Sequence, residues 1–147
     1  MDDTHPIITQ NAQETAALGQ KFAEYLRDGE VPRVLCLYGN LGSGKTTFTQ
    51  GIAKGLGIAS RLLSPTFIIV RRYDLVKLDE NLYHIDLYRL NTTDEMEELG
   101  LSEIFADPNA YVIIEWAEKL PELPEKRLDI WFKALDDGRH EITMKNI

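Results

Sequence analysis

Residues 39–46 read GNLGSGKT, and this octapeptide constrains the fold more than any other part of the chain. It fits the pattern G-x-x-x-x-G-K-[ST], in which the glycines let the backbone curl so that successive N–H groups point into one hollow. The run before it, 33–38, is almost wholly apolar, as in a strand buried on both faces. Phe48, Ile52 and Leu56 recur after it at a spacing of four, which indicates one face of a helix. A strand, a glycine loop and a helix in this order predict an anion site, because the helix presents its positive end to the loop.

The side chains of the loop are those that a polyphosphate ligand requires. Lys45 can reach the β- and γ-phosphates as a point charge, and Thr46 offers a hydroxyl to a magnesium ion. Thr47 is the next residue and could contact an α-phosphate. The alternative is a glycine turn that carries a lysine by chance. It is disfavoured because a buried strand precedes the motif and a helix follows it.

Two carboxylates stand at the ends of apolar runs. Asp86 follows the run 82–85, and Glu115 follows the run 111–114. A nucleoside triphosphate site needs acids that hold magnesium and polarise water. Taken singly, each acid is typical of a solvated strand end, but beside a phosphate loop we predict a functional role for both. The run before Glu115 is the more completely apolar, which predicts that its strand lies beside the strand of the phosphate loop.

The rest of the chain alternates between helix and strand patterns. Helix signals cover 12–28 and 101–105 and also begin at Thr92; strand signals cover 7–9, 67–70, 82–85, 128–132 and 140–144. Two hairpins are indicated, one through 79–81 and one around Asp137-Gly138. The pattern predicts an α/β chain with the P-loop NTPase fold, in three layers, whose mixed sheet has a parallel core and antiparallel edge hairpins.

Length and composition limit the classes of function. The chain has 147 residues, which fits a single nucleotide-binding domain over 1–147. Its 24 acidic and 16 basic residues give a net charge of −8, which disfavours a protein that binds nucleic acid alone, since phosphates repel it. Cys36 is the single cysteine, so neither an intrachain disulfide nor a multi-cysteine metal site is expected. The chain has no long apolar run and an acidic start, so we expect a cytoplasmic protein without membrane contact.

Several other features have a structural and a functional interpretation. The run 64–67 is either a loop that senses the γ-phosphate or a turn before a hairpin. Trp116 favours core packing, although a nucleotide or partner could stack on it. His84 favours a structural role within a strand, and Arg71-Arg72 a solvated strand end. The acidic run 94–98 is an exposed helix face or a dock for a basic partner. No Asn/Thr-Lys-x-Asp motif for guanine is present, so adenine is favoured.

The order and spacing of these motifs resemble those of the small bacterial P-loop ATPases of the TsaE type. The resemblance covers about residues 12–120 and is carried by GNLGSGKTTF at 39–48, SPTF at 64–67, LYHIDLYRL at 82–90, ELGL at 98–101 and IEW at 114–116. Two departures are mild. Asn40 stands where the family often has Asp, and Ser43 where it often has Ala, and neither removes a required group.

The resemblance implies a magnesium-dependent ATPase and assigns roles to residues. Lys45, Asp86 and Glu115 would be catalytic, and Thr46, Asp86 and Glu115 would hold Mg²⁺. Either acid could contact the metal directly or through water. ATP would contact the following residues: Thr15, Leu41, Gly42, Ser43, Gly44, Lys45, Thr46, Thr47, Thr66, Trp116 and Arg139. Within that set, Thr66 would lie in a mobile loop near the γ-phosphate and Thr15 near the base.

The resemblance also implies partners. Members of the family act in the formation of threonylcarbamoyladenosine in tRNA, through a threonylcarbamoyl-transferring protein and its paralogous partner. This chain would meet tRNA only indirectly, through that complex, and its ATP hydrolysis, slow alone, would reset the complex. Two rival functions keep the same fold: a small-molecule kinase, and a binding module in which the nucleotide sets conformation without turnover. The kinase requires a lid rich in arginine, and the sequence offers no obvious one.

Overall fold

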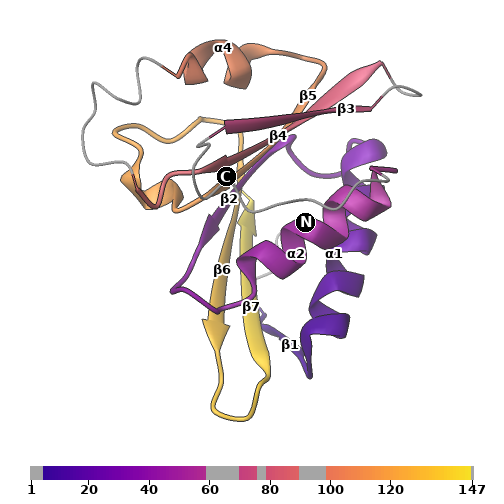
Figure 1. Cartoon of the computed structure of the whole chain (residues 1–147), viewed down its shortest axis with the longest axis vertical. Helices are drawn as coiled ribbons and strands as arrows, with labels where there is room; N and C mark the ends of the chain where they lie inside the picture. Colours follow the sequence, from indigo (N-terminus) through magenta and orange to yellow (C-terminus); the bar gives the residue numbers. More distant parts are fainter. Residues whose placement is uncertain (1–4, 59–69, 76–78, 90–98, 147) are drawn as a thin grey trace.

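The computed structural model describes residues 5–58, 70–75, 79–89 and 99–146 (Figure 1). The strands are β1 (Ile7–Thr9), β2 (Val34–Tyr38), β3 (Val70–Leu75), β4 (Glu80–Asp86), β5 (Ala110–Glu115), β6 (Leu128–Ala134) and β7 (His140–Asn146). The helices are α1 (Ala12–Arg27), α2 (Lys45–Gly55), α4 (Leu101–Ala106) and the short 3-10 helix η2 (Ala117–Lys119). In the part of the chain so described, no helix has both the length and the apolar character needed to cross a membrane.

The strands form one mixed sheet in the order β1-β7-β6-β2-β5-β4-β3. β2 runs parallel to both of its neighbours, β5 and β6, and β5 runs parallel to β4. The pairs at the two edges, β3–β4, β6–β7 and β1–β7, are antiparallel. The predicted parallel core with antiparallel edge hairpins is therefore confirmed, and so is the prediction that the strand ending in Glu115 lies beside the strand of the phosphate loop.

Both faces of the sheet are covered, which gives the predicted three layers. Leu35 and Leu37 of β2 face an apolar cluster that contains Phe22 of α1 and Phe48 of α2. The intervening Cys36 faces a second cluster, to which α4 contributes Leu101. Figure 1 shows α1 and α2 side by side on one face of the sheet and α4 well apart from them. Burial on both faces explains why the strand before the glycine loop is continuously apolar.

Helix α1 begins and ends close to the predicted bounds of 12–28. Asn11 caps its first turn, since its side-chain Oδ1 accepts from the backbone N–H of Glu14 at 2.9 Å. The Glu14 carboxylate reaches back to the backbone N–H of Gln10, one residue before the cap, also at 2.9 Å. The predicted capping pair is thus present, with its reciprocal bond shifted by one residue.

Two glycines bring α1 and α2 into close contact. A Cβ atom on Gly19 of α1 would lie 2.3 Å from the carbonyl oxygen of Phe48. A Cβ atom on Gly51 of α2 would lie 2.1 Å from the carbonyl oxygen of Ala16. Real Cβ atoms do not approach so closely, so the two helix backbones can touch only because these positions are glycine. This contact fixes the position of α2, and with it the position of Lys45 and Thr46 at the start of that helix.

The first hairpin differs from the sequence prediction. Its first described strand is β3, over Val70–Leu75, whereas the apolar run predicted 67–70. The pair Arg71-Arg72, predicted as a strand end, lies inside β3, because an edge strand alternates polar and apolar residues instead of being continuously apolar. β4 begins at Glu80, within the predicted turn at 79–81. Residues 67–69 and the helix predicted from Thr92 lie outside the described residues.

The closing elements agree with the prediction. β6 and β7 pair in an antiparallel hairpin, and Gly138 at its turn has a φ of 83°. Such a left-handed conformation favours glycine, which is why the Asp137-Gly138 dipeptide predicted this turn. The predicted short helix at 101–105 is α4.

Candidate functional site

The phosphate loop joins β2 to α2 and lines a cavity of about 280 Å³. The described lining residues are Leu41, Gly42, Ser43, Gly44, Lys45, Thr46, Thr47, Asp86, Tyr88, Arg89, Glu115, Trp116 and His140. Asp86 and Glu115 are the last residues of β4 and β5, which run parallel to each other; β5 lies next to β2, and β4 lies on the other side of β5. The cavity thus lies at the carboxyl ends of the parallel strands, where open α/β sheets bind their ligands.

The loop backbone has a conformation that requires glycine. Gly44 has a φ of 107°, and a Cβ atom there would lie 3.1 Å from Nδ1 of His140. Gly44 is also the N-cap of α2, and no side chain caps the first turn of that helix. The N–H groups of the first turn therefore remain for a ligand, and they carry the positive end of the helix dipole. This arrangement suits a phosphate group.

Lys45 lies at the centre of the site. Its Nζ donates to the carbonyl oxygen of Gly39 and lies 3.8 Å from the centroid of the Trp116 ring. Burial lowers the pKa of Lys45, and the nearby carboxylate of Glu115 acts in the opposite direction. Trp116 has a φ of 61°, an uncommon conformation for a bulky residue. Residues in such sparsely populated backbone conformations cluster at functional sites.

Glu115 connects the phosphate loop to the interior of the sheet. Thr46 Oγ1 donates to Glu115 Oε1 at 3.1 Å, and Nε2 of His84 lies 2.5 Å from Glu115 Oε2. Glu115 and His84 are both buried. A buried carboxylate needs such partners, because its desolvation is costly when its oxygens are unpaired.

Asp86 lies next to Glu115 in the register between β4 and β5. Burial raises the pKa of the Asp86 carboxyl above its ordinary range, and the neighbouring charge of Glu115 raises it further. The backbone N–H of Tyr88 donates to Asp86 Oδ1 at 3.0 Å and opposes that shift. Two carboxylates, Asp86 and Glu115, therefore lie side by side in the lining of the cavity that also contains Lys45.

The residues at the cavity fit a magnesium ion that is shared with a phosphate ligand. Over the described ranges, no group of three or more His, Cys, Asp or Glu residues could hold a metal by itself. Mg²⁺ in nucleotide sites commonly uses one or two carboxylates together with phosphate oxygens, so a large protein cage is not required. Thr46, Glu115 and Asp86 supply oxygens of this kind. The hydroxyl of Ser43, buried in the loop without a hydrogen-bond partner, is a further group available to a ligand.

The structure brings most of the predicted site residues together. Ten of them line the cavity: Leu41, Gly42, Ser43, Gly44, Lys45, Thr46, Thr47, Asp86, Glu115 and Trp116. Thr15 is absent from the lining; its hydroxyl lies 2.6 Å from that of Thr9 and 3.1 Å from Nδ1 of His140. Arg139 lies at the β6–β7 turn, where its Nε is 2.7 Å from Asp137 Oδ1. Thr66 lies outside the described residues.

Sequence reasoning missed three lining residues and one residue behind the cavity. Tyr88 and Arg89 lie two and three residues after Asp86 in the motif at 82–90, so the motif itself could have found them. His84 lies two residues before Asp86 in the same strand, and residues two apart face the same side of a sheet. His140 comes from the far end of the chain and has no local signal.

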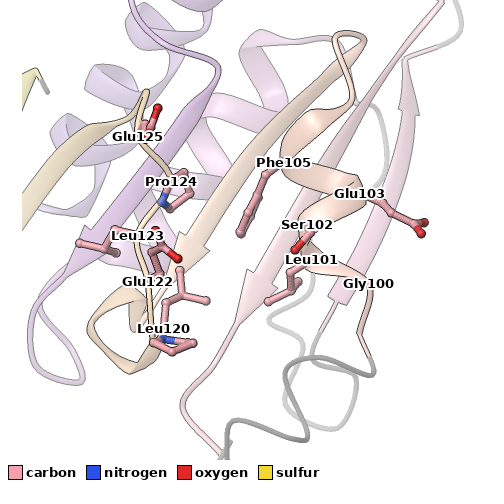
Figure 2. Close-up of a pocket in the computed structure, with 11 residues that line it drawn as sticks. Gly100, Leu101, Ser102, Glu103, Phe105, Leu120, Glu122, Leu123, Pro124 and Glu125 are labelled. Carbon is pink, nitrogen blue, oxygen red and sulfur yellow. The ribbon is translucent and has the colours of Figure 1, made fainter.

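A second cavity, of about 630 Å³, lies between α4 and the segment 120–125. Figure 2 shows Leu101 and Phe105 on the α4 side and Leu123 on the other, with Glu122 and Glu125 along the segment. None of its described lining residues lines the phosphate-loop cavity. Its described lining contains carboxylates and one serine but no histidine, cysteine, lysine or arginine.

A mixed sheet with a glycine loop between a central strand and the N-terminus of a helix defines a protein with the P-loop NTPase fold. The model of the family described as "Threonylcarbamoyl adenosine biosynthesis protein TsaE" matches residues 9–142. The chain belongs to this TsaE family, as the sequence motifs indicated.

Individual relatives agree with the family match. The tRNA threonylcarbamoyladenosine biosynthesis protein TsaE of Bacillus subtilis (strain 168) is 44% identical over 136 residues, which cover 92% of this chain and 81% of the relative. The protein of the same name from Treponema pallidum (strain Nichols) is 38% identical, over 93% of this chain and 97% of the relative. The crystal structure of Bacillus subtilis YdiB matches with a TM-score of 0.74 and 36% identity, covering 100% of this chain and 88% of that one. This chain is therefore similar to its relatives over the whole fold and not only in the motifs.

Proposed function

We propose that this chain binds ATP and Mg²⁺ in the phosphate-loop cavity and hydrolyses the ATP during tRNA threonylcarbamoyladenosine biosynthesis. The observation that carries the proposal is the meeting of a cation, a hydroxyl and a carboxylate at one end of the sheet. Thr46 Oγ1 lies 3.1 Å from Glu115 Oε1, and the neighbouring Lys45 is held on the loop backbone. These are the groups on which phosphoryl transfer depends. The names of the relatives support the pathway.

Each residue has a defined task in the proposed reaction. The loop amides and the first turn of α2 bind phosphate oxygens, and Lys45 leaves the Gly39 carbonyl to reach the β- and γ-phosphates. Thr46 and the buried Glu115 hold the metal ion. Asp86 is only partly buried, so it is the acid that can orient the attacking water. Bound Mg²⁺ supplies positive charge that offsets the charge on the transferred phosphoryl group.

The proposal includes a role for partner proteins. A threonylcarbamoyl-transferring protein and its paralogous partner hold the tRNA, and turnover by this chain resets their complex. The net charge of −8 supports an indirect contact with tRNA. Two apolar side chains on the cavity lining are exposed, Leu41 at 68% and Tyr88 at 44%, so a partner protein can contact the mouth of the nucleotide site.

The proposal is tested by ATP binding and turnover of the purified chain, alone and with the two partner proteins and tRNA. We expect Lys45→Ala to weaken ATP binding about 10- to 100-fold, the loss expected for a charge-assisted contact. We expect Glu115→Gln to bind ATP but lose the turnover that the partners stimulate. Lys54→Ala, an exposed lysine on the same helix, is the matched control and should behave as wild type.

The other outcomes distinguish the rival functions. Unchanged ATP affinity in Lys45→Ala would show that the cavity is not the nucleotide site. Tight binding without turnover, even with partners present, would identify a binding module. Transfer of the γ-phosphate to a metabolite instead of water would identify a kinase.

A further inference from the structure

His84 is a fully buried histidine in contact with a proposed metal ligand. It lies in β4 with none of its surface exposed, and its Nε2 is 2.5 Å from Glu115 Oε2. The other oxygen of the same carboxylate accepts the hydrogen bond of Thr46 at 3.1 Å. Glu115 is thus held at both oxygens, by the phosphate loop on one side and by the interior of the sheet on the other.

The strand register explains why a residue at this position reaches the carboxylate. β4 and β5 run parallel, with His84 opposite Ile113 and Asp86 opposite Glu115. Residues two apart in a strand share a face, so His84 and Glu115 lie diagonally across neighbouring strands. Ile113 belongs to the apolar cluster that contains Phe48 of α2, which places this face under the phosphate-binding helix.

The second ring nitrogen of His84, Nδ1, indicates that this residue does more than fill volume in the core. Nδ1 is buried and has no hydrogen-bond partner. A leucine or phenylalanine would fill the interior without an unpaired nitrogen, whose burial costs free energy. A histidine here is favourable only if the bond from Nε2 to Glu115 offsets that cost.

We propose that His84 is a positioning residue for metal binding: its Nε2 donates to Glu115 Oε2 and so keeps Glu115 Oε1 directed at Thr46. The inference rests on the proposed Mg²⁺–ATP site and names a residue that supports it from behind the cavity. Hydrogen bonds of this kind fix the orientation of carboxylate ligands and tune the affinity for the metal. Without the donor, Glu115 Oε2 is buried and unpaired, and the side chain turns away from Thr46 to find another partner.

The test compares nucleotide binding with and without the metal. A fluorescent ATP analogue is titrated into each variant in excess Mg²⁺ and again in EDTA, and the ratio of the two affinities is the gain due to the metal. We expect His84→Leu to reduce this gain about 10- to 100-fold, the usual effect of losing a partner of a ligand. Affinity in EDTA should stay within about twofold, because the loop amides and Lys45 are intact. The side chain of Gln can place an amide N–H near the position of Nε2, so His84→Gln should keep most of the gain.

Two controls separate positioning from packing. Leu82→Val removes volume from the same face of the same strand and should lower thermal stability without changing the metal gain. His84→Asn is polar like His84→Gln but too short to reach Glu115, so it should lose the gain. The comparison of His84→Gln with His84→Asn keeps the test valid if His84→Leu fails to fold.

The inference is overturned if His84→Leu keeps the full gain, if the Gln and Asn variants have equal gains, or if Leu82→Val loses as much as His84→Leu. A wild-type chain that binds no ATP analogue would instead contradict the proposed function itself. The two failures are therefore distinguishable.

Discussion

Two residues at the cavity, Lys45 and Asp86, lie in environments that disfavour their charged forms. Burial lowers the pKa of Lys45 and raises that of Asp86. For Asp86 the ordinary value is 3.8, and the folded chain binds the carboxyl proton more tightly than the unfolded chain does. The free energy of unfolding therefore falls as the pH rises from about 4 through the raised pKa of Asp86. At pH values above its raised pKa, the ionised Asp86 carboxylate lowers the free energy of unfolding of the chain.

We expect Asp86→Asn to raise the Tm of the ligand-free chain at pH 7.5 by about 2–4 °C, the shift that roughly 1 kcal/mol produces in a chain of this size. The gain should disappear near pH 3, where wild-type Asp86 is protonated. Differential scanning calorimetry at both pH values measures it. Asp74→Asn, an exposed acid on β3, is the control and should change the Tm little. A lower Tm for Asp86→Asn at pH 7.5 would contradict the sign of the shift.

At the scale of elements, the contact between α1 and α2 determines where the phosphate loop lies. Gly19 and Gly51 allow the two backbones to touch, and α2 carries Lys45 and Thr46 at its start. A helix displaced from α1 would move both side chains away from Glu115. The glycine contact is therefore a structural requirement of the site, although neither glycine lines the cavity.

We expect Gly51→Ala to lower the free energy of unfolding by about 1–3 kcal/mol, because the added methyl group would overlap the carbonyl oxygen of Ala16. On helix propensity alone, alanine would stabilise this position relative to glycine, so the sign of the change distinguishes the two effects. Urea unfolding monitored by circular dichroism measures the difference. Lys54→Ala, on the exposed side of α2, should stay within about 0.5 kcal/mol of wild type. A Gly51→Ala variant as stable as wild type would show that the helices can separate without cost.

At the scale of the whole molecule, the cavity collects residues from distant parts of the chain. Its lining comes from four separate segments, which meet at the carboxyl ends of the parallel strands and are represented by Leu41, Asp86, Glu115 and His140. A ligand that fills this cavity would contact the loop, the ends of β4 and β5 and the C-terminal hairpin together. Its binding free energy therefore adds to the stability of the whole fold.

We expect Mg²⁺–ATP at 100 times its Kd to stabilise the chain by about 2.7 kcal/mol, which corresponds to a rise in Tm of roughly 5–10 °C. A thermal shift titration measures the rise and its dependence on ligand concentration. Lys45→Ala should show a much smaller rise at the same concentration. No rise in the wild-type chain would count against nucleotide binding in this cavity.

The local elements were predictable where their signals are local. Three features have their whole sequence signal within one short segment: the continuous apolar run of β2, the cap of α1 by Asn11 and the turn at Gly138. The prediction of 67–70 did not include the described part of β3 after Val70, because Val70–Leu75 alternates in polarity and the apolar run before it gives the stronger signal.

The amino-acid sequence by itself determined the phosphate loop, the two strand-end acids and the family, because a backbone that curls around an anion needs glycines, a lysine and a hydroxyl at set spacings. Only the tertiary structure decided which side chains meet there. The pairing of β4 with β5 brings His84 to Glu115, and the C-terminal hairpin brings His140 to Gly44. Those contacts join residues far apart in the chain, so they depend on strand order and register, which no short stretch of sequence encodes.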